Sequence, residues 1–358
     1  MGLCLSPQSG AVTSGKAPAL ALAPPAFFDD AMHFPPRLLA LFLTLLAVLP
    51  LRAAEDFLPG VKRIVFLGDS ITYAGEYVDT FELFLFCRFP QRTFEVIDCG
   101  LPSETVSGLS EDGHAGGKFP RPDLHERLDR VLSKTKPDLV FACYGMNDGI
   151  YLPLDETRFA KYRDGIMRLR EKVAASGAQI IHLTPPTFHH LDARPKPSAD
   201  GKAPASMLGG YNEVLDRYSA WLLEQRAKGW RVIDIHGPMN AAIEAQRKTN
   251  PDFVYAKDGV HANSEGHALM ADQLIAGLAT ADVAWWQKLK TNLAANPKGA
   301  ELRKLIHQRV RLLCDAYLND AGHLRPGMAK GLPVADAEAK AAELEKNIRA
   351  TVAEIIPK

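Results

Sequence analysis

The feature that most constrains this fold is the alternation of short apolar runs with longer amphipathic segments. Five of the runs are rich in Val, Ile and Phe and are typical of buried strands. Parallel strands need a helix-sized crossover between them, so this alternation predicts a parallel sheet with helices on both faces. The predicted strands span residues 61–67, 93–99, 138–143, 179–184 and 230–235.

Helical periodicity fills the intervals between these strands and continues after the last of them. The predicted helices span residues 77–88, 122–133, 156–175, 208–228, 238–248 and 264–278. From about Ala281 onward the pattern is helix, loop and helix, with no further strand. We therefore expect a three-layer α/β/α sandwich within residues 55–280, built on a five-stranded parallel sheet, and a helical C-terminal extension over 281–358.

The N-terminal segment has the order of a signal peptide. Arg37 precedes the apolar run Leu38–Leu51, and small residues and then acidic residues follow it. A run this short is not expected to span a bilayer. Residues 1–54 are therefore predicted to be a leader, with translation starting at Met32 and residues 1–31 artefactual or an overlong leader. This predicts export to the periplasm or the medium; an uncleaved N-terminal anchor is the alternative.

Charge and cysteine usage exclude other classes of protein. The chain has 42 Lys and Arg against 42 Asp and Glu, so it lacks the basic excess of a nucleic-acid binder. No Cys or His spacing typical of a metal site is present, and neither a metal nor an organic cofactor is implied. Four cysteines follow the leader and are expected to be buried free thiols. They are Cys87, Cys99, Cys143 and Cys314.

Polar residues with chemical potential follow the predicted strands. Ser70 comes directly after the first strand, Gly100–Thr105 after the second and Asn147 after the third, and Asp258 and His261 lie near the end of the domain. In parallel sheets the ligand site lies outside the carboxyl ends of the strands. A serine there attacks an acyl group only when a base takes its proton, and a histidine held by a carboxylate is such a base. Donors must also face the developing oxyanion.

These segments resemble the SGNH hydrolase superfamily, also called GDSL esterases and lipases. The GDS block at Ser70, the loop after the second strand, the GxND block at Asn147 and the DxxH block ending at His261 occur in the family's order. The resemblance implies a flavodoxin-like fold, with Ser70 as nucleophile, His261 as general base and Asp258 as its orienting partner. It also implies an oxyanion hole formed by the Ser70 N–H, the Ser103 N–H and the Asn147 side chain.

One position departs from the family pattern. The family usually has glycine where this chain has Ser103. The backbone N–H survives that change, but a positive φ at this position would strain a serine. Gly100 corresponds to the other glycine of that block, and its neighbourhood is an alternative source of the oxyanion donor. Two acidic residues beside the motifs, Asp69 and Asp148, are expected to hold turns. His182, in an apolar strand, is expected to be a hydrogen-bonded core histidine.

Gly100 and three further residues are candidate contacts with substrate. Tyr144 follows the third strand, and His114 lies in a glycine-rich loop that either lines the mouth of the site or is plain loop. His189 lies in the long loop 185–204, which is interpreted as a polar rim or an insertion rather than a metal site. A polar turn at 322–327 either reaches the substrate or caps a helix.

The leading hypothesis is an exported serine esterase that removes O-acetyl groups from carbohydrates. Tyrosines near the strand ends favour a sugar over an acyl chain; they are Tyr73, Tyr77, Tyr144 and Tyr151. A lysophospholipase or general carboxylesterase is the enzymatic alternative. A carbohydrate-binding protein without catalysis, or a scaffolding protein that binds a partner through its helical tail, is the alternative outside enzymes. A small-molecule or glycan ester is the expected partner, and no nucleic acid is.

Overall fold

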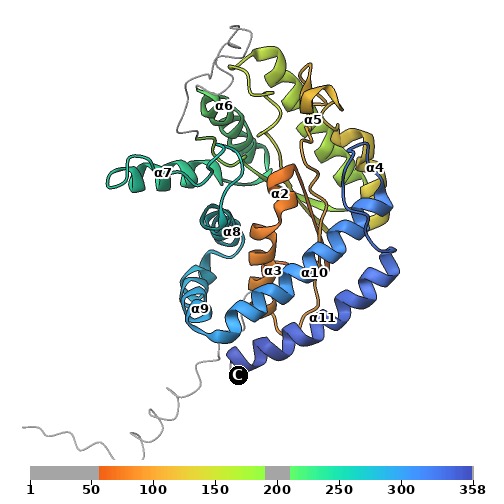
Figure 1. Cartoon of the computed structure of the whole chain (residues 1–358), viewed down its shortest axis with the longest axis vertical. Helices are drawn as coiled ribbons and strands as arrows, with labels where there is room; N and C mark the ends of the chain where they lie inside the picture. The colour runs from red at the N-terminus through yellow and green to blue at the C-terminus, as the bar shows by residue number, and fades with distance from the viewer. Residues whose placement is uncertain (1–55, 190–209, 357–358) are drawn as a thin grey trace, which may run out of the picture. The chain divides into compact units, whose positions relative to one another are not determined.

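The structure, a computed structural model, describes residues 56–189 and 210–356. The predicted leader, residues 1–54, and most of the loop 185–204 lie outside these residues. The described residues contain a parallel sheet of five strands in the order β2-β1-β3-β4-β5 (Figure 1). The predicted fold class is thereby confirmed. The strands are β1 (Arg63–Gly68), β2 (Glu95–Asp98), β3 (Leu139–Cys143), β4 (Gln179–Leu183) and β5 (Arg231–Ile233).

Helices cover both faces of the sheet. Since crossovers between parallel strands are right-handed, the step from β1 to β2 and the steps from β2 toward β5 place their helices on opposite faces. Helix α3 accordingly packs against α8 on one face, and α4 packs against α5 on the other. The helices are α2 (Ser70–Ala74), α3 (Glu76–Arg88), α4 (Leu124–Thr135), α5 (Glu156–Ala175), α6 (Tyr211–Glu224), α7 (His236–Arg247) and α8 (Ser264–Leu278).

Three element boundaries differ from the sequence-based prediction for identifiable reasons. Helix α4 begins at Leu124 rather than at 122, because the Asp123 side chain caps it by accepting the His125 N–H at 2.9 Å. Strand β5 ends at Ile233 rather than at 235, because the Thr184 hydroxyl accepts the backbone N–H groups of Ile235 and His236. Helix α7 consequently begins before Pro238, which is tolerated in a first turn.

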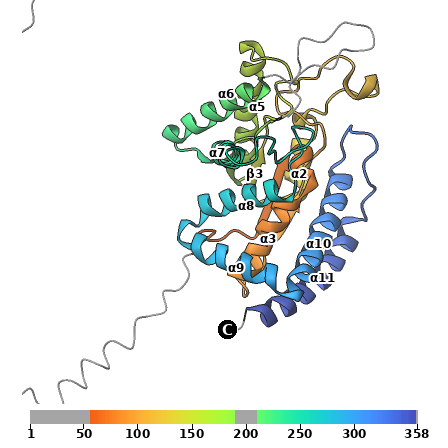
Figure 2. The same ribbon diagram turned by 60° about the vertical axis from the view of Figure 1, so that its left-hand side comes forward.

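The C-terminal extension is helical, as predicted, and packs closely on the sheet domain. It comprises α9 (Val283–Ala295), α10 (Pro297–Ala321) and α11 (Val334–Ile355). Both views show α10 beside α11 and alongside α3 (Figures 1 and 2). Helix α10 also packs on the edge strand β2, which shields that edge from other chains. Arg309 of α10 forms a buried ion pair with Glu82 of α3, and one hydrophobic core runs through the sheet and these helices.

The four cysteines within the described residues are all buried and free. Among the same residues, no helix has the length and apolar character needed to cross a membrane.

Candidate active site

The turn between β1 and α2 places Ser70 at the carboxyl end of β1, an inner strand of the sheet. A Cβ at Gly68 would lie 2.0 Å from Thr72 Oγ1, so only glycine allows the chain to turn this tightly. Asp69 caps α2 because its carboxylate accepts the Ile71 N–H at 2.9 Å. Burial raises the pKa of Asp69 to about 7, and the Ile71 N–H opposes that rise. Asp69 thus has the turn-holding contact expected from the sequence.

His261 and Asp258 approach Ser70 from a loop 191 residues further along the chain. His261 Nε2 lies 2.8 Å from Ser70 Oγ, and His261 Nδ1 lies 2.7 Å from Asp258 Oδ2. Asp258 Oδ1 also accepts the backbone N–H groups of Val260 and His261 at 2.9 and 2.8 Å. One carboxylate therefore fixes both the ring and the loop that carries it, and the ring nitrogen facing Ser70 is free to accept its proton.

The Asp258 carboxyl is tuned to stay ionised beside the imidazole. Partial burial by itself raises its pKa, but the hydrogen bonds from the His261 ring and from the two backbone N–H groups outweigh burial and lower the pKa. The side chains of His261 and Asp258 are 53% and 56% exposed, so the described residues leave the reacting edge open.

Candidate oxyanion donors come from three segments. Ser70 opens α2, so its backbone N–H is one of the first-turn groups that no helical carbonyl accepts. Ser103 has a φ of 70°, which is the left-handed conformation. This is the strain expected from the sequence for a serine at a position where the family usually has glycine. Gly100 does not offer its N–H, which donates to Asp98 Oδ1 at 2.8 Å. A Cβ at Gly100 would lie 2.4 Å from the Tyr73 nitrogen, so this glycine serves close packing.

Asn147 is held in one amide orientation. Its Nδ2 donates to the Glu104 carbonyl at 3.1 Å, and its Oδ1 accepts the Tyr151 hydroxyl at 3.0 Å. An amide nitrogen carries two hydrogens, so the second is available to an oxyanion. Tyr151 and the preceding Ile150 have φ values of 56° and 48°, strained backbone of the kind found at functional sites. Asp148 joins this loop to the loop that follows β2, because its carboxylate accepts the Ser107 N–H at 2.8 Å.

A buried ion pair supports the loop that carries Ser103. Arg127 donates to both carboxylate oxygens of Glu104 at 2.6 and 2.7 Å and to the Cys99 carbonyl at 2.7 Å. The Tyr144 hydroxyl donates to the same carboxylate at 2.7 Å. Tyr144 is therefore buried and does not line the opening, in contrast to its expected contact with substrate. Tyr77 is also fully buried, so only Tyr73 and Tyr151 of the four tyrosines reach the surface.

The two candidate histidines lie in different surroundings. His114 bonds Glu111 at 3.1 Å, and Glu111 in turn holds Arg121, whose guanidinium lies 5.3 Å from the centre of the Tyr151 ring. The residue of this network that lies against the Asn147 loop is therefore Arg121, which stacks near Tyr151, and not His114 itself. His189 bonds Asn240 of α7 at 2.9 Å, on the β5 side of the sheet.

His182 differs from the expectation in one respect. It is buried on β4 and stacks on Trp230, but within the described residues neither ring nitrogen has a hydrogen-bond partner. Burial, with Arg170 nearby, lowers its pKa to about 3. The same part of the chain contains no group of three or more His, Cys, Asp or Glu residues that fits a metal ion.

Sequence reasoning assigned no role at the site to Glu104, Arg127 or Arg121, and it placed Tyr151 only near the strand ends. Tyr151 reaches Asn147 from a backbone with a positive φ. The Glu104–Arg127 pair joins the loop after β2 to helix α4, 23 residues further along the chain. No local pattern in the sequence encodes either feature. The only signal was the position of Tyr151 shortly after the GxND block.

The fold is a three-layer α/β/α sandwich, and the carboxyl edge of its sheet brings a serine, a histidine and an aspartate into one hydrogen-bonded line. The sequence model of the GDSL-like Lipase/Acylhydrolase family matches residues 66–269, more than half of the chain, and the chain belongs to this family. It is accordingly an enzyme that hydrolyses ester bonds. None of the curated proteins compared with the chain is similar enough to match.

Several solved structures resemble the chain over part of its length. A gut microbial diltiazem-metabolizing enzyme has 23% identity and a TM-score of 0.46, covering 62% of this chain and 48% of its own. This chain thus spans about half the length of that protein. An acetylxylan esterase from Geobacillus stearothermophilus has 19% identity and a TM-score of 0.44, covering 61% and 94%. A GDSL-like lipase from Bacteroides thetaiotaomicron has 20% identity and a TM-score of 0.39, covering 62% and 89%. At these values the likeness has no bearing on substrate.

Proposed function

We propose that Ser70, His261 and Asp258 form the catalytic triad of this esterase. The continuous hydrogen-bonded line from Ser70 Oγ through the imidazole to Asp258 carries the proposal, at 2.8 and 2.7 Å. Ser70 Oγ attacks the ester carbonyl carbon while His261 Nε2 takes the hydroxyl proton. The C–O bond to the alcohol then breaks, and His261 returns the proton to the departing oxygen. Water attacks the acyl-enzyme by the same route and releases the acid and Ser70.

The negative oxygen of each tetrahedral intermediate is assigned to three donors: the backbone N–H groups of Ser70 and Ser103 and the Asn147 amide. Such donors stabilise charge that develops only in the transition state, so they raise kcat more than they lower KM. The fixed orientation of Asn147 between Glu104 and Tyr151 supports its part in this assignment.

For the substrate we propose an O-acetyl group on a carbohydrate. The exposure of His261 and Asp258 supports a substrate larger than the acyl group, because an open edge suits a polymer better than a tunnel does. A lysophospholipase or a general carboxylesterase is the competing function. Hydrolysis rates on acetylated xylan and other acetylated glycans, compared with p-nitrophenyl esters of 2 to 12 carbons, separate the two. Acetyl preference and release of acetate from a glycan are expected; a preference for long acyl chains would contradict the proposal.

The same panel tests the triad. Ser70→Ala should lose all measurable turnover on every ester that the wild type hydrolyses. Equal turnover by both proteins would assign the nucleophile elsewhere, or leave a binding protein with adventitious activity.

Export and domain organisation are further proposals. Residues 1–54 are assigned to a leader that directs export, 55–280 to the hydrolase domain and 281–358 to its helical extension. The basic, apolar and small-residue order of the leader supports its assignment. Expression of the full chain in a bacterial host, followed by N-terminal sequencing of the exported fraction, should find a start close to residue 55. Retention in the membrane fraction with the apolar run intact would favour the anchor.

A further inference from the structure

One face of α10 contacts the helix that carries Ser70. Arg311 Nη1 donates to the Tyr73 carbonyl at 2.7 Å, and its guanidinium lies 4.2 Å from the centre of the Tyr73 ring. Tyr73 is three residues beyond Ser70, near the end of the five-residue helix α2. The last carbonyls of a helix have no intrahelical donor, and a helix of one turn is not stable by itself. Arg311 therefore satisfies an end group of the helix that begins with Ser70.

The same face of α10 also contacts the loop that carries Ser103. Leu101 is fully buried in a small cluster with Cys314 and Leu318 of α10, and Tyr73 packs against this cluster. Positions 311, 314 and 318 follow the spacing that lines up side chains on one side of a helix. A single stripe of α10 thus supports both Tyr73, three residues after Ser70, and Leu101, two residues before Ser103.

Contacts elsewhere hold α10 itself in place. Asp315 accepts from Arg311 Nη2 at 2.6 Å, which orients the guanidinium toward α2. Arg309 is paired with Glu82 inside the core. Leu302, Ile306 and Val310 of α10 are fully buried in the hydrophobic core. Helix α10 is therefore a fixed support for whatever rests on it.

We propose that one face of α10, formed by Arg311, Cys314 and Leu318, positions the catalytic groups: Arg311 is a positioning residue for the Ser70 helix, and Cys314 and Leu318 support the Ser103 loop. This inference rests on the proposed role of Ser70. Helix α10 lies beyond the residues matched by the family, 66–269, so the support is a property of this chain's extension. Displacement of a reacting atom by about 1 Å costs on the order of 100-fold in rate, so a lost contact at Tyr73 acts on catalysis.

The test compares two arginines that make the same kind of contact. Arg311→Met removes the donors to α2. Arg130→Met, the matched control, removes an arginine of α4 that also donates to a backbone carbonyl, that of Ala321 at the C-terminal end of α10, at 2.7 Å. Each variant is measured for kcat and KM on p-nitrophenyl acetate, for the rate of inactivation by the phosphorylating agent paraoxon, and for Tm.

Arg311→Met is expected to lower kcat and the paraoxon rate by about tenfold each, with KM changed less than twofold, since both reactions need an aligned Ser70. Arg130→Met should keep both rates within twofold at a similar loss of Tm. Arg311→Lys retains a donor and a charge and should recover at least a third of the wild-type kcat.

Two results would overturn the inference. One is a wild-type kcat for Arg311→Met, and the other is an equal loss in both methionine variants, which would indicate general destabilisation. Ser70→Ala run in parallel keeps this outcome separate from the proposed function. If Ser70→Ala remained active, the nucleophile assignment would fail irrespective of Arg311.

A second pair tests the Ser103 side. Leu318→Ala removes the support beneath Leu101, whereas Leu313→Ala opens a similar space in the main core. Leu318→Ala should lower kcat about threefold, and Leu313→Ala should lower only Tm. A wild-type kcat for Leu318→Ala would remove the Ser103 loop from the proposal.

Discussion

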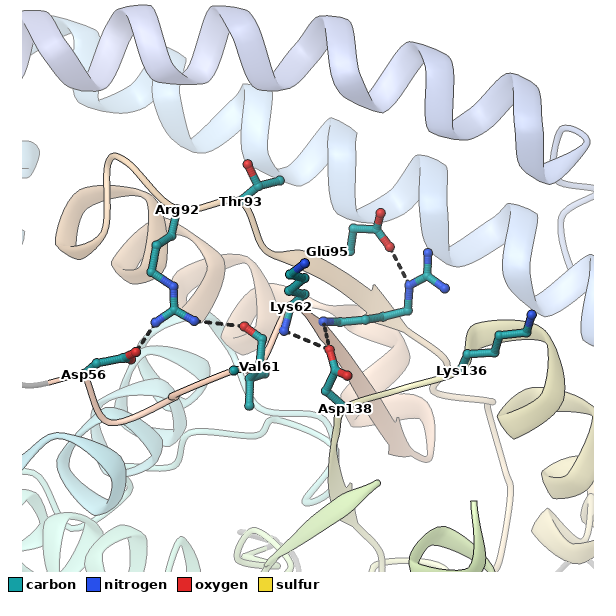
Figure 3. A pocket seen from close by; sticks show the side chains of 10 residues that line it. Asp56, Val61, Lys62, Arg92, Thr93, Glu95, Lys136 and Asp138 are labelled. Atoms are coloured by element: carbon teal, nitrogen blue, oxygen red, sulfur yellow. Dashed lines mark hydrogen bonds and ion pairs between the residues drawn. The ribbon is translucent and has the colours of Figure 1, made fainter. Parts of the chain in front are cut away.

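The two ends of the sheet use charged residues in opposite ways. At the amino ends of the strands lies a cavity of about 690 Å³, which Figure 3 shows lined by charged side chains. Those side chains bind one another and the backbone: Arg63 pairs with Glu95, and Asp138 accepts the Lys62 and Arg63 N–H groups. At the carboxyl ends, Ser70, His261 and Asp258 are joined by hydrogen bonds, and the side chains of His261 and Asp258 are exposed to solvent. A cavity lined by charged residues is therefore no guide to the chemistry here; alignment of a nucleophile with its base is.

The largest expected difference between the two ends is in catalysis. His261→Ala removes the proposed base and should lower kcat/KM by about 10³-fold or more, because the serine then keeps its proton. Asp138→Asn, at the amino end, retains an acceptor for its two N–H groups and should keep kcat/KM within twofold. Turnover of p-nitrophenyl acetate measures both. A large loss in Asp138→Asn would show that the amino end takes part in the reaction.

A smaller effect is expected from the hydroxyl that orients Asn147. Tyr151→Phe frees the Asn147 amide to rotate and should lower kcat by about tenfold with little change in KM, as expected for a weakened oxyanion donor. Tyr317→Phe is the matched control, because that hydroxyl donates to Glu338 near the start of β2. Its kcat should be that of the wild type. Equal values for all three proteins would remove Tyr151 from the site.

Between the two ends, His182 links stability to pH. Its folded-state pKa, lowered to about 3 by burial, lies below that of an unfolded histidine, so the unfolded state binds the extra proton first. Stability should therefore fall as pH drops below about 6.5, by up to about 1.4 kcal/mol per pH unit from this residue. Urea unfolding of His182→Leu between pH 7.5 and 5 should show a shallower fall than the wild type.

His307 provides the opposite sign. Its hydrogen bond to Asp79 raises its pKa, so its contribution to stability is present at low pH and is lost as pH rises through the raised value. His307→Leu should therefore lose more stability at pH 5 than at pH 7.5. Parallel curves for the wild type and both variants would contradict this account of the two histidines.

The smallest expected effect compares strained backbone at the two ends. Ser103 and Lys136 have φ values of 70° and 46°. Glycine relieves the strain but adds freedom to the unfolded chain, so Ser103→Gly and Lys136→Gly should each raise the free energy of unfolding by about 0.5 kcal/mol. Urea denaturation measures this. The kcat of Ser103→Gly should be unchanged because the N–H remains; a lower kcat would mean that the Ser103 side chain contributes.

The sequence predicted the sheet and its flanking helices because apolar periodicity records burial directly. Helices α5 and α8 begin and end at the predicted residues, whereas β5 is shorter because a side chain 51 residues away, Thr184, takes over its backbone donors. A contact of that range leaves no mark on local periodicity. For the same reason the sequence predicted residues 281–358 to be a separate appendage, although a buried ion pair between Arg309 and Glu82 joins this extension to α3.

The candidate site was predictable where it rests on motifs. Ser70, His261 and Asp258 were named from their blocks, and the structure brings them within hydrogen-bond distance. Residues that act through others were not predictable in this way. Tyr144 and Tyr151 look alike in the sequence, but one lies buried on Glu104 and the other reaches Asn147 through a strained backbone.

The most direct test of the central claim is to locate the nucleophile chemically. Paraoxon should transfer one diethylphosphoryl group to the wild-type enzyme, and mass spectrometry of the digested protein should find it on Ser70, with His261→Ala labelled at least 100-fold more slowly. Labelling of another residue, or full esterase activity with no label on Ser70, would contradict the account.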